Sequence, residues 1–306
     1  MDGDQAAETR APSTGEVKKM LPKFDYFAPE TLQETLELLD KHGQESKLMA
    51  GGTDLIVSLR ARERLPKNVI DIKGVKELHE LLYDEKRGLS VGAAVTLNRL
   101  IHYGAVSKNF PVLTEAVSTI GDFEIRNRAT LAGNVCNASP AADSAPALLV
   151  LEATVNVVSR KRKRTVPIRE FFTGVKKTVL ANNEMVTSIN VPTPPKGAVG
   201  GYLKARRTVG EDLAVVGVGG LVTPAGKADK SVRLAYASVA PTPVRAFEAE
   251  KIFESAKPLD QLLDQAMPIV KKAVSPISDV RGGKEYRINL VEVLTRRLIG
   301  RLCEGG

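Results

Sequence analysis

Residues 119–134 read TIGDFEIRNRATLAGN, and residues 135–146 continue as VCNASPAADSAP. The apolar residues of this stretch follow neither a helical nor a strand period, and small or turn-forming residues dominate it. A glycine-bearing loop that also carries hydroxyl and amide side chains suits one side of a pyrophosphate. Asp143 adds an acceptor-only carboxylate, which suits the hydroxyl groups of a ribose or ribityl chain. The stretch therefore predicts an irregular ligand-binding segment.

Another glycine loop, Ala50-Gly51-Gly52-Thr53-Asp54, lies upstream. It follows an expected strand at Lys47–Ala50 and precedes an expected helix to about Arg62, which Thr53 or Asp54 could cap. Glycines without a Cβ let backbone N–H groups approach a phosphate, and a helix N-terminus adds partial positive charge. A tight turn between strand and helix explains the Gly-Gly pair equally well. The loop is not a GxGxxG fingerprint, and the chain contains no GK[ST] Walker sequence.

Regular elements flank both loops. The spacing of apolar residues predicts five helices, at Glu30–His42, from Thr96 or Asn98 onward, and at Val112–Thr119, Leu259–Ala273 and Arg287–Cys303. It also predicts six strands, at Asn68–Ile72, Gly88–Ala93, Ala153–Ser159, Thr165–Ile168, Val215–Val222 and Val232–Ala240. Residues 1 to about 20 are predicted to be a disordered extension. The strands after Pro192–Pro195 are followed by helices, which predicts a small α+β C-terminal domain.

Length and composition exclude several classes of protein. With 306 residues, the chain has room for two domains of roughly 150 residues. Its two cysteines and three histidines cannot form a disulfide framework, a four-cysteine cluster site or an HExxH metal site. No apolar run reaches the roughly 18 residues of a membrane span, and no secretory signal is recognisable, so a cytoplasmic location is expected. The basic run Arg160–Arg164 lies between two expected strands and is interpreted as an exposed hairpin tip, and nucleic-acid binding is not expected.

A third motif gives the loops a family context. It reads YLKARR at residues 202–207 and continues as EDLA at 211–214. Together the three motifs resemble the FAD-binding subunit of the molybdenum hydroxylases, whose pattern is AGGT(D/N)L, then TIG…IRNRGTIGGN…ASPAAD, then K…RR…DLA. That family includes the medium subunit of carbon monoxide dehydrogenase, the flavin domain of xanthine dehydrogenase and the flavin subunit of hydroxybenzoyl-CoA reductases. The resemblance covers residues 21 to 303. An extra four-cysteine insert typical of the last branch is lacking here, which disfavours that branch.

The resemblance implies an α+β fold in two parts. The first is a two-lobed FAD-binding domain of the vanillyl-alcohol-oxidase (PCMH) type at residues 21–198, with lobes at about 21–75 and 76–198. The second is a small α+β domain at 199–306, similar to the C-terminal domain of carbon monoxide dehydrogenase flavoproteins.

The resemblance also implies noncovalent FAD. Residues 48–55 would wrap the diphosphate, residues 119–121 would close on it, Asp143 would hold the sugar-like chain, and Leu213 would lie against the isoalloxazine. The implied cofactor contacts are Leu48, Met49, Ala50, Gly51, Gly52, Thr53, Asp54, Leu55, Thr119, Ile120, Gly121, Thr130, Gly133, Asn134, Asp143, Val186, Lys204 and Leu213.

Five residues in the second motif have alternative interpretations. Ala129 and Ala132 replace family glycines, and the added Cβ atoms matter only where φ must be positive. Arg126 and Arg128 could neutralise the flavin phosphates, contact a partner, or be simple surface charge. Cys136 could be a redox group, but we favour a small packed hydrophobe.

The implied function is electron transfer within a larger oxidoreductase. Molybdopterin and 2Fe–2S clusters would lie only on partner subunits, an iron–sulfur small subunit and a molybdopterin large subunit, in a dimer of heterotrimers. FAD would exchange electrons with NAD or a quinone, and no catalytic side chain or metal ligand is assigned in this chain. A stand-alone flavin oxidase or dehydrogenase of the same fold and a non-catalytic nucleotide-binding subunit are the alternatives.

Overall fold

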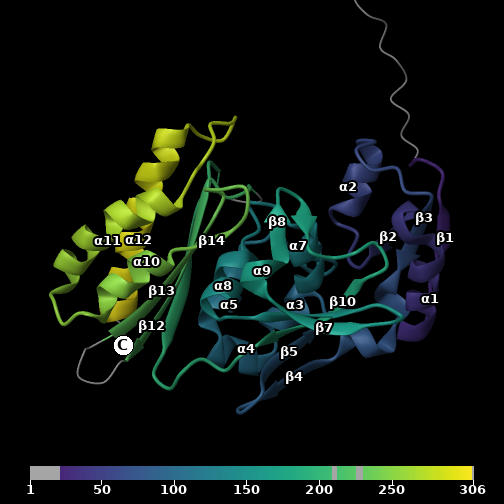
Figure 1. Cartoon of the computed structure of the whole chain (residues 1–306), viewed down its shortest axis with the longest axis horizontal. Helices are drawn as coiled ribbons and strands as arrows, with labels where there is room; N and C mark the ends of the chain where they lie inside the picture. Colours follow the sequence, from purple (N-terminus) through teal and green to yellow (C-terminus); the bar gives the residue numbers. More distant parts are fainter. Residues whose placement is uncertain (1–20, 209–211, 225–229, 305–306) are drawn as a thin grey trace, which may run out of the picture.

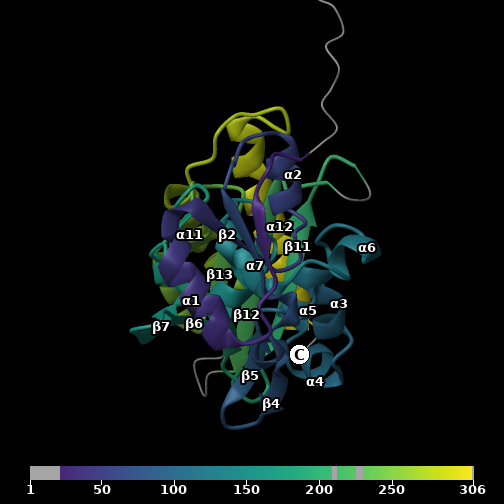
Figure 2. The ribbon, with the colours of Figure 1, turned by 90° about the vertical axis from the view of Figure 1, so that its right-hand side faces the viewer.

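The computed structural model describes residues 21–208, 212–224 and 230–304. The expected N-terminal extension therefore lies outside the described residues. Three larger sheets follow one another along the longest axis of the molecule, with the N-terminal sheet at one end and the C-terminal sheet at the other (Figure 1). The view in Figure 2 faces the N-terminal end, where β1 and α1 lie in front of α7 and α12.

The N-terminal sheet is parallel, with strand order β1-β3-β2. Its elements are β1 (Asp25–Phe27), α1 (Leu32–His42), β2 (Ser46–Met49), α2 (Leu55–Arg60) and β3 (Asn68–Asp71). The strand–loop–helix–strand unit predicted from the first glycine loop is thus present as β2, α2 and β3. Asp54 lies at the N-cap of α2, but its carboxylate makes no capping hydrogen bond there, because its backbone is already helical (φ −90°, ψ −40°).

The middle sheet is antiparallel, with order β4-β5-β10-β6-β7. Its strands are β4 (Leu81–Asp84), β5 (Gly88–Gly92), β6 (Thr154–Val158), β7 (Lys163–Pro167) and β10 (Met185–Val191), and a small hairpin of β8 (Phe172–Gly174) and β9 (Lys177–Thr178) lies beside it. The predicted pair around Arg160–Arg164 is confirmed as the β6–β7 hairpin. Its basic run is only partly a turn, since Arg164 lies in β7 and forms an ion pair with Glu184 (2.6 Å).

The helices of this middle part are short and differ widely in burial. They are α3 (Leu97–Ile101), α4 (Gly104–Asn109), α5 (Pro111–Ser118), α6 (Phe123–Arg126), α7 (Leu131–Asn137), α8 (Ser144–Val150) and α9 (Ile168–Phe171). Every residue of α8 is buried. The expectation that residues 120–145 lack regular structure was wrong, because α6 and α7 begin there at the side-chain caps Asp122 and Thr130. Helices of four and seven residues are too short to show an apolar period.

The C-terminal part is the predicted α+β arrangement, a four-stranded antiparallel sheet of order β11-β12-β13-β14 covered by helices. Its elements are β11 (Val199–Ala205), β12 (Val216–Pro224), β13 (Lys230–Ala237), β14 (Val244–Arg245), α10 (Phe247–Glu250), α11 (Leu259–Ala273) and α12 (Lys284–Glu304). β11 carries the first four residues of the YLKARR motif, Tyr202–Ala205, and was not predicted as a strand.

β12 lies between two helices that approach it very closely. A Cβ on Gly219 would come within 3.0 Å of Pro146 in α8, and one on Gly220 within 3.1 Å of Leu298 in α12. The glycines therefore allow the C-terminal sheet to pack directly on the middle part of the chain.

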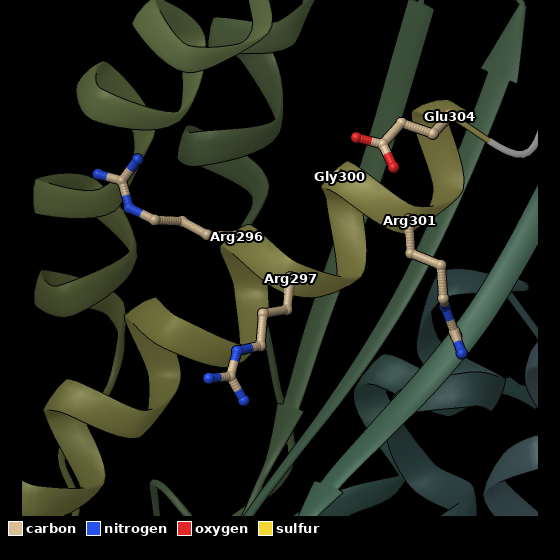
Figure 3. Close-up of a pocket in the computed structure, with 5 residues that line it drawn as sticks. All are labelled: Arg296, Arg297, Gly300, Arg301 and Glu304. Carbon is tan, nitrogen blue, oxygen red and sulfur yellow. The ribbon is translucent and has the colours of Figure 1, made fainter.

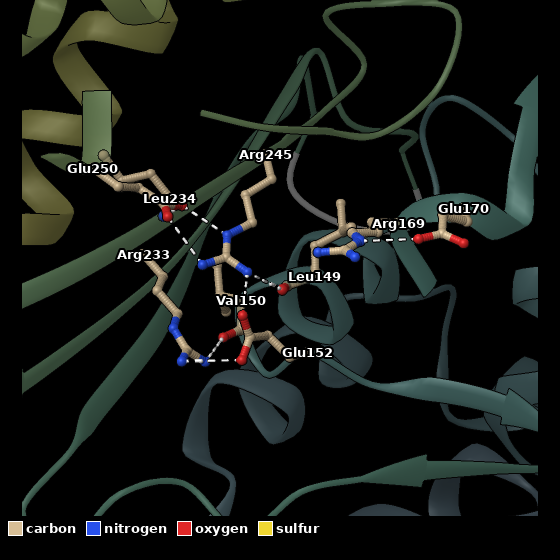
Figure 4. A network of polar contacts seen from close by, with 9 residues as sticks. All are labelled: Leu149, Val150, Glu152, Arg169, Glu170, Arg233, Leu234, Arg245 and Glu250. Carbon is tan, nitrogen blue, oxygen red and sulfur yellow. Dashed lines mark hydrogen bonds and ion pairs between the residues drawn. The ribbon is translucent and has the colours of Figure 1, made fainter. Parts of the chain in front are cut away.

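Charged side chains reinforce this junction. Arg245 in β14 donates to Glu152 (2.9 Å) and Glu250 (2.8 Å), and Arg233 in β13 donates to the carbonyl oxygen of Val150 at the end of α8 (3.0 Å; Figure 4). Because Arg233 also pairs with Glu152 (3.0 Å), this one carboxylate accepts from two strands of the C-terminal sheet.

Candidate functional site

The two glycine loops of the sequence touch each other in the structure. The first loop (residues 50–54) joins β2 to α2, and the second loop (residues 119–134) runs from the end of α5 through α6 into α7. A Cβ on Gly51 would lie 2.1 Å from the carbonyl oxygen of Arg128 and 2.8 Å from the Cα of Ala129. Only a glycine at position 51 permits this approach of the two backbones.

The first loop presents a row of unpaired backbone donors. Within the described ranges, the N–H groups of Gly51, Gly52, Thr53 and Asp54 donate to no protein acceptor, although Ile56 N–H bonds back to the Gly52 carbonyl oxygen (2.9 Å). Gly52 has a φ of +77°, which turns the chain between β2 and α2. Consecutive N–H groups in such a turn form an anion-binding concavity.

Two charged groups at this row of donors are partly desolvated. Asp54 has exposed surface, yet burial by the surrounding protein raises the pKa of its carboxyl, against the opposing effects of Lys176, Arg64 and the Asn137 side chain. Burial, followed by repulsion from Arg64, lowers the pKa of the Lys47 ammonium at the neighbouring strand β2. The surrounding protein thus disfavours the charged form of both groups, although both keep exposed surface.

The start of the second loop is fixed by an arginine. Arg126 donates to the carbonyl oxygens of Ile120 (3.0 Å) and Gly121 (2.9 Å) and to Asn98 Oδ1 (3.3 Å). Gly121 has a φ of +52°, and a Cβ there would lie 2.7 Å from Ile125. Arg126 is thus a structural clamp on the TIG segment, whereas Arg128 is exposed.

The end of the second loop is held by the caps of α7. Thr130 Oγ1 accepts from the N–H of Gly133 (2.9 Å), and Asn134 Oδ1 accepts from the Ser144 hydroxyl (2.6 Å). Ala129 and Ala132, the two replacements of family glycines, are buried and neither has a positive φ. Their Cβ atoms are accommodated without backbone strain.

A buried polar triad joins the second loop to β11. Tyr202 donates its hydroxyl to Asp143 Oδ1 (2.6 Å), and Lys204 donates to Asp143 Oδ2 (2.9 Å) and to the carbonyl oxygen of Thr119 (3.1 Å). Asp143 is 4% exposed, so burial raises the pKa of its carboxyl while Lys204 and Tyr202 oppose that rise. Sequence reasoning missed Tyr202; its signal was its place two residues before Lys204, on the same face of a strand.

The remaining predicted contacts are less closely grouped. Val186 lies in β10, next to a β-bulge, and its side chain is buried in the core of the middle part. Leu213 precedes β12 and is 47% exposed, so its apolar side chain is accessible to a ligand or partner. Burial raises the pKa of the Cys136 thiol to about 12, which favours packing over redox chemistry at this position.

Two kinds of feature are absent from the described residues, a metal site and a membrane-spanning helix. No group of three or more His, Cys, Asp or Glu side chains could hold a metal ion there, and no helix among them is long and apolar enough to cross a membrane.

A groove of about 550 Å³ lies elsewhere, on α12, and is lined by Arg296, Arg297, Gly300, Arg301 and Glu304 (Figure 3). Two of its arginines are engaged in ion pairs, Arg296 with Asp264 and Arg301 with Glu115 (2.7 and 2.8 Å). The groove includes no residue of either glycine loop and is not the candidate site.

The two loops and β11 together have the donors that FAD requires. The unpaired N–H groups of the first loop suit a diphosphate, and the buried Lys204 ammonium beside the Thr119 carbonyl suits a polar part of the cofactor. Leu213, an exposed apolar residue just before β12, suits a flat aromatic ring.

Comparisons with known proteins agree with this fit. Residues 22–194 match the family described as the FAD-binding domain in molybdopterin dehydrogenase, and residues 201–302 match the CO dehydrogenase flavoprotein C-terminal domain. The chain is 32% identical to the xanthine dehydrogenase FAD-binding subunit of Escherichia coli O157:H7, over 90% of this chain and 94% of that protein. It is 33% identical to the glyceraldehyde dehydrogenase medium chain of Sulfolobus acidocaldarius, over 90% of this chain and 97% of that protein.

Solved structures agree as well. A chain in a crystal structure of the Cu,Mo-CO dehydrogenase superposes with a TM-score of 0.88 at 28% identity, covering 94% of this chain and all of that chain. The family resemblance and the fold class predicted from the motifs are confirmed.

Proposed function

The chain belongs to the family of FAD-binding subunits of the molybdopterin dehydrogenases, and from this premise we propose that it holds one FAD noncovalently and relays electrons between a partner's iron–sulfur clusters and an external acceptor. The observation that supports this proposal most strongly is the row of four unpaired N–H groups at Gly51–Asp54. This row lies against the second loop at Gly51. A buried or recessed N–H without an acceptor is unfavourable, and a phosphate oxygen would satisfy it.

The proposed FAD contacts are those of the three motifs, together with Val186 of β10. Leu48–Leu55 wraps the diphosphate, Thr119–Gly121 closes on it, and Thr130, Gly133 and Asn134 add hydrogen bonds. Asp143, Val186, Lys204 and Leu213 complete the set.

FAD supplies one- and two-electron chemistry when it is bound. The residues of the chain orient it and set its electrostatic surroundings: the first loop with backbone N–H groups, Lys204 with a buried positive charge, and Leu213 with an apolar surface. No side chain of the site is assigned a proton-transfer step.

The proposed partners are an iron–sulfur small subunit and a molybdopterin large subunit, in a dimer of heterotrimers, with NAD or a quinone as acceptor. Similar proteins carry names such as carbon monoxide dehydrogenase medium chain and nicotine 6-hydroxylase medium subunit, which are names of parts of larger enzymes. The chain has only two cysteines, too few for a four-cysteine cluster of its own.

The test is the flavin content of the purified chain. We expect about one FAD per chain, released intact by acid or heat because no covalent link forms. Gly52→Asp should abolish binding, since it places a carboxylate where the diphosphate must approach the backbone.

Gly43→Asp is the matched control for Gly52→Asp. Gly43 also has a positive φ (+45°), and a Cβ there would meet no atom within 4 Å, so the substitution causes similar backbone strain away from the site. Equal flavin content in both variants would contradict the role of the first loop. Covalent flavin, or FMN in place of FAD, would contradict the cofactor assignment.

The assembly is tested separately, by native mass measurement of the protein purified from its own cell. A monomer or homodimer that oxidises a small organic substrate unaided would favour the stand-alone flavoenzyme instead.

A further inference from the structure

Three buried side chains connect the candidate site to the C-terminal sheet. Tyr202 is 4% exposed, and the side chains of Lys204 and Asp143 are 5% and 6% exposed. Each carboxylate oxygen of Asp143 has its own donor, Tyr202 on Oδ1 and Lys204 on Oδ2. Both donors come from β11, whereas Asp143 precedes α8 far away in sequence.

The orientation of Asp143 depends on both donors. A carboxylate held at one oxygen can rotate about its last torsion, which is broad for Asp. The Tyr202 hydroxyl, at 2.6 Å, fixes that torsion, so that Oδ2 faces the ammonium of Lys204. Lys204 in turn lies 3.1 Å from the Thr119 carbonyl oxygen of the second loop.

We propose that Tyr202 is a positioning residue of the FAD site: its hydroxyl holds Asp143 so that the Lys204 ammonium is fixed at the second loop, where it meets the cofactor. This inference rests on the proposed function, because it assigns Tyr202 a role in that same site.

Lys204 has a donor left for a ligand. An ammonium has three N–H groups, and two of them are used, on Asp143 and on Thr119. Within the described ranges the third has no protein acceptor. The two bonds fix the orientation of this buried ammonium and leave the third N–H for a ligand.

The neighbouring strand is built around the tyrosine hydroxyl. A Cβ on Gly217 of β12 would lie 2.3 Å from the Tyr202 hydroxyl oxygen. Position 217 is paired with Lys204 across the two strands, so the missing side chain leaves the space through which the hydroxyl reaches Asp143.

The hydroxyl also keeps its proton. Burial, with the negative charge of Asp143 beside it, holds the pKa of Tyr202 well above its ordinary value. Tyr202 therefore donates to Asp143 over the whole working range of pH, and phenylalanine would fill the same space without that donation.

The test compares two tyrosine-to-phenylalanine variants of the full chain. Tyr202→Phe should raise the dissociation constant for added FAD about tenfold or more, the range expected for a lost hydrogen bond to a charged group. Tyr236→Phe is the control. Among the described residues its buried hydroxyl bonds only to Thr295 of α12 (3.0 Å), so this variant should lose some stability and keep wild-type FAD affinity.

The pH dependence separates positioning from packing. Protonation of Asp143 releases Lys204, so FAD affinity should fall as the pH drops through the pKa of Asp143. The charged and titratable groups that act on Asp143 are Lys204, Tyr202 and Arg206. Tyr202→Phe removes a donor that lowers that pKa, so the fall should begin at a higher pH than in the wild type.

Gly217→Ala tests the same role by another change, because its Cβ would displace the Tyr202 hydroxyl without removing it. We expect it to weaken FAD affinity as Tyr202→Phe does, and it replaces that variant if Tyr202→Phe does not fold. Tyr202→Phe with the FAD affinity and pH profile of Tyr236→Phe would overturn the proposal. A wild-type chain that binds no FAD would instead overturn the proposed function, and this inference with it.

Discussion

The two glycine loops meet at Gly51 but are built in opposite ways. In the first loop, residues 50–54, four consecutive N–H groups have no acceptor among the described residues. In the second loop, residues 119–134, the polar groups largely bond to one another: Arg126 clamps two carbonyls, Asp122 caps Ile125 (2.6 Å) and Thr130 caps Gly133. The first loop therefore has donors left for a ligand, while the hydrogen bonds of the second loop are already formed within the protein.

This difference separates binding from folding. A change that blocks the N–H donors of the first loop, without disturbing its contact with the second loop, should alter ligand affinity with little effect on stability. A change in the second loop should alter both, because its hydrogen bonds hold the protein together before any ligand arrives.

Gly51→Ala tests the contact between the loops and should have the largest effect. Its Cβ would lie 2.1 Å from the Arg128 carbonyl oxygen, a backbone atom that cannot move away alone. We expect no detectable FAD in the purified protein and a loss of about 1–3 kcal/mol in the free energy of unfolding, typical of overpacking. Absorbance spectra and denaturant titration measure both.

Gly174→Ala is its control, since a Cβ there meets nothing closer than 3.8 Å. If Gly51→Ala retained as much FAD as Gly174→Ala, the close contact of the two loops would not be required for FAD binding.

Arg126→Gln tests the scaffold and should have an intermediate effect. It removes the donations to Ile120 and Gly121, which are hydrogen bonds from a charged group worth about 1.5–3 kcal/mol when buried and less here, where Arg126 is half-buried. We expect a lower midpoint of denaturation and a severalfold weaker FAD affinity. The exposed neighbour Arg128, changed to Gln, should alter neither. Weaker FAD binding with unchanged stability would contradict the scaffold role and indicate that Arg126 acts on the ligand, as the first loop is proposed to do.

Asp54→Asn tests the first loop and should have the smallest effect. The amide keeps the backbone N–H groups and the size of the side chain, so FAD affinity at neutral pH should change by less than about threefold, as for other exposed charges.

The pH dependence of stability should change in the same variant. Burial raises the pKa of Asp54 in the folded chain, so its contribution to stability is present in full below the pKa of the unfolded chain. That contribution is lost as the pH rises through the folded-state pKa. Asp54→Asn should remove this dependence from the acidic side of a curve of unfolding free energy against pH. An unchanged curve would mean that the Asp54 carboxyl is not desolvated in the folded chain.

Much of the fold was predictable because its elements carry local signals. The period of apolar residues in Leu259–Ala273 predicted α11 with the correct ends, and the alternation on either side of Arg160–Arg164 predicted the β6–β7 hairpin. β11 could not be found in this way, because two of its seven residues are glycines that make room for α5 and α12.

The candidate site was only partly predictable. The three motifs identified the loops and the ligand class through the family resemblance, and the family is confirmed; the individual contacts stay predictions. The spacing of residues within a loop could not reveal that Arg126 donates to carbonyl oxygens of its own loop. Nor could it reveal Tyr202, whose partner Asp143 lies 59 residues away and is brought near only by the packing of β11 against the middle part.

That packing has a consequence for biosynthesis. Chains emerge from the ribosome N-terminal end first. The first loop is made early, but Tyr202 and Lys204 lie in β11, β11 is paired with β12, and both strands pack under α12, which ends at Glu304. We therefore expect the site to be complete only after α12 has been made, so that FAD would bind late in the synthesis of the chain.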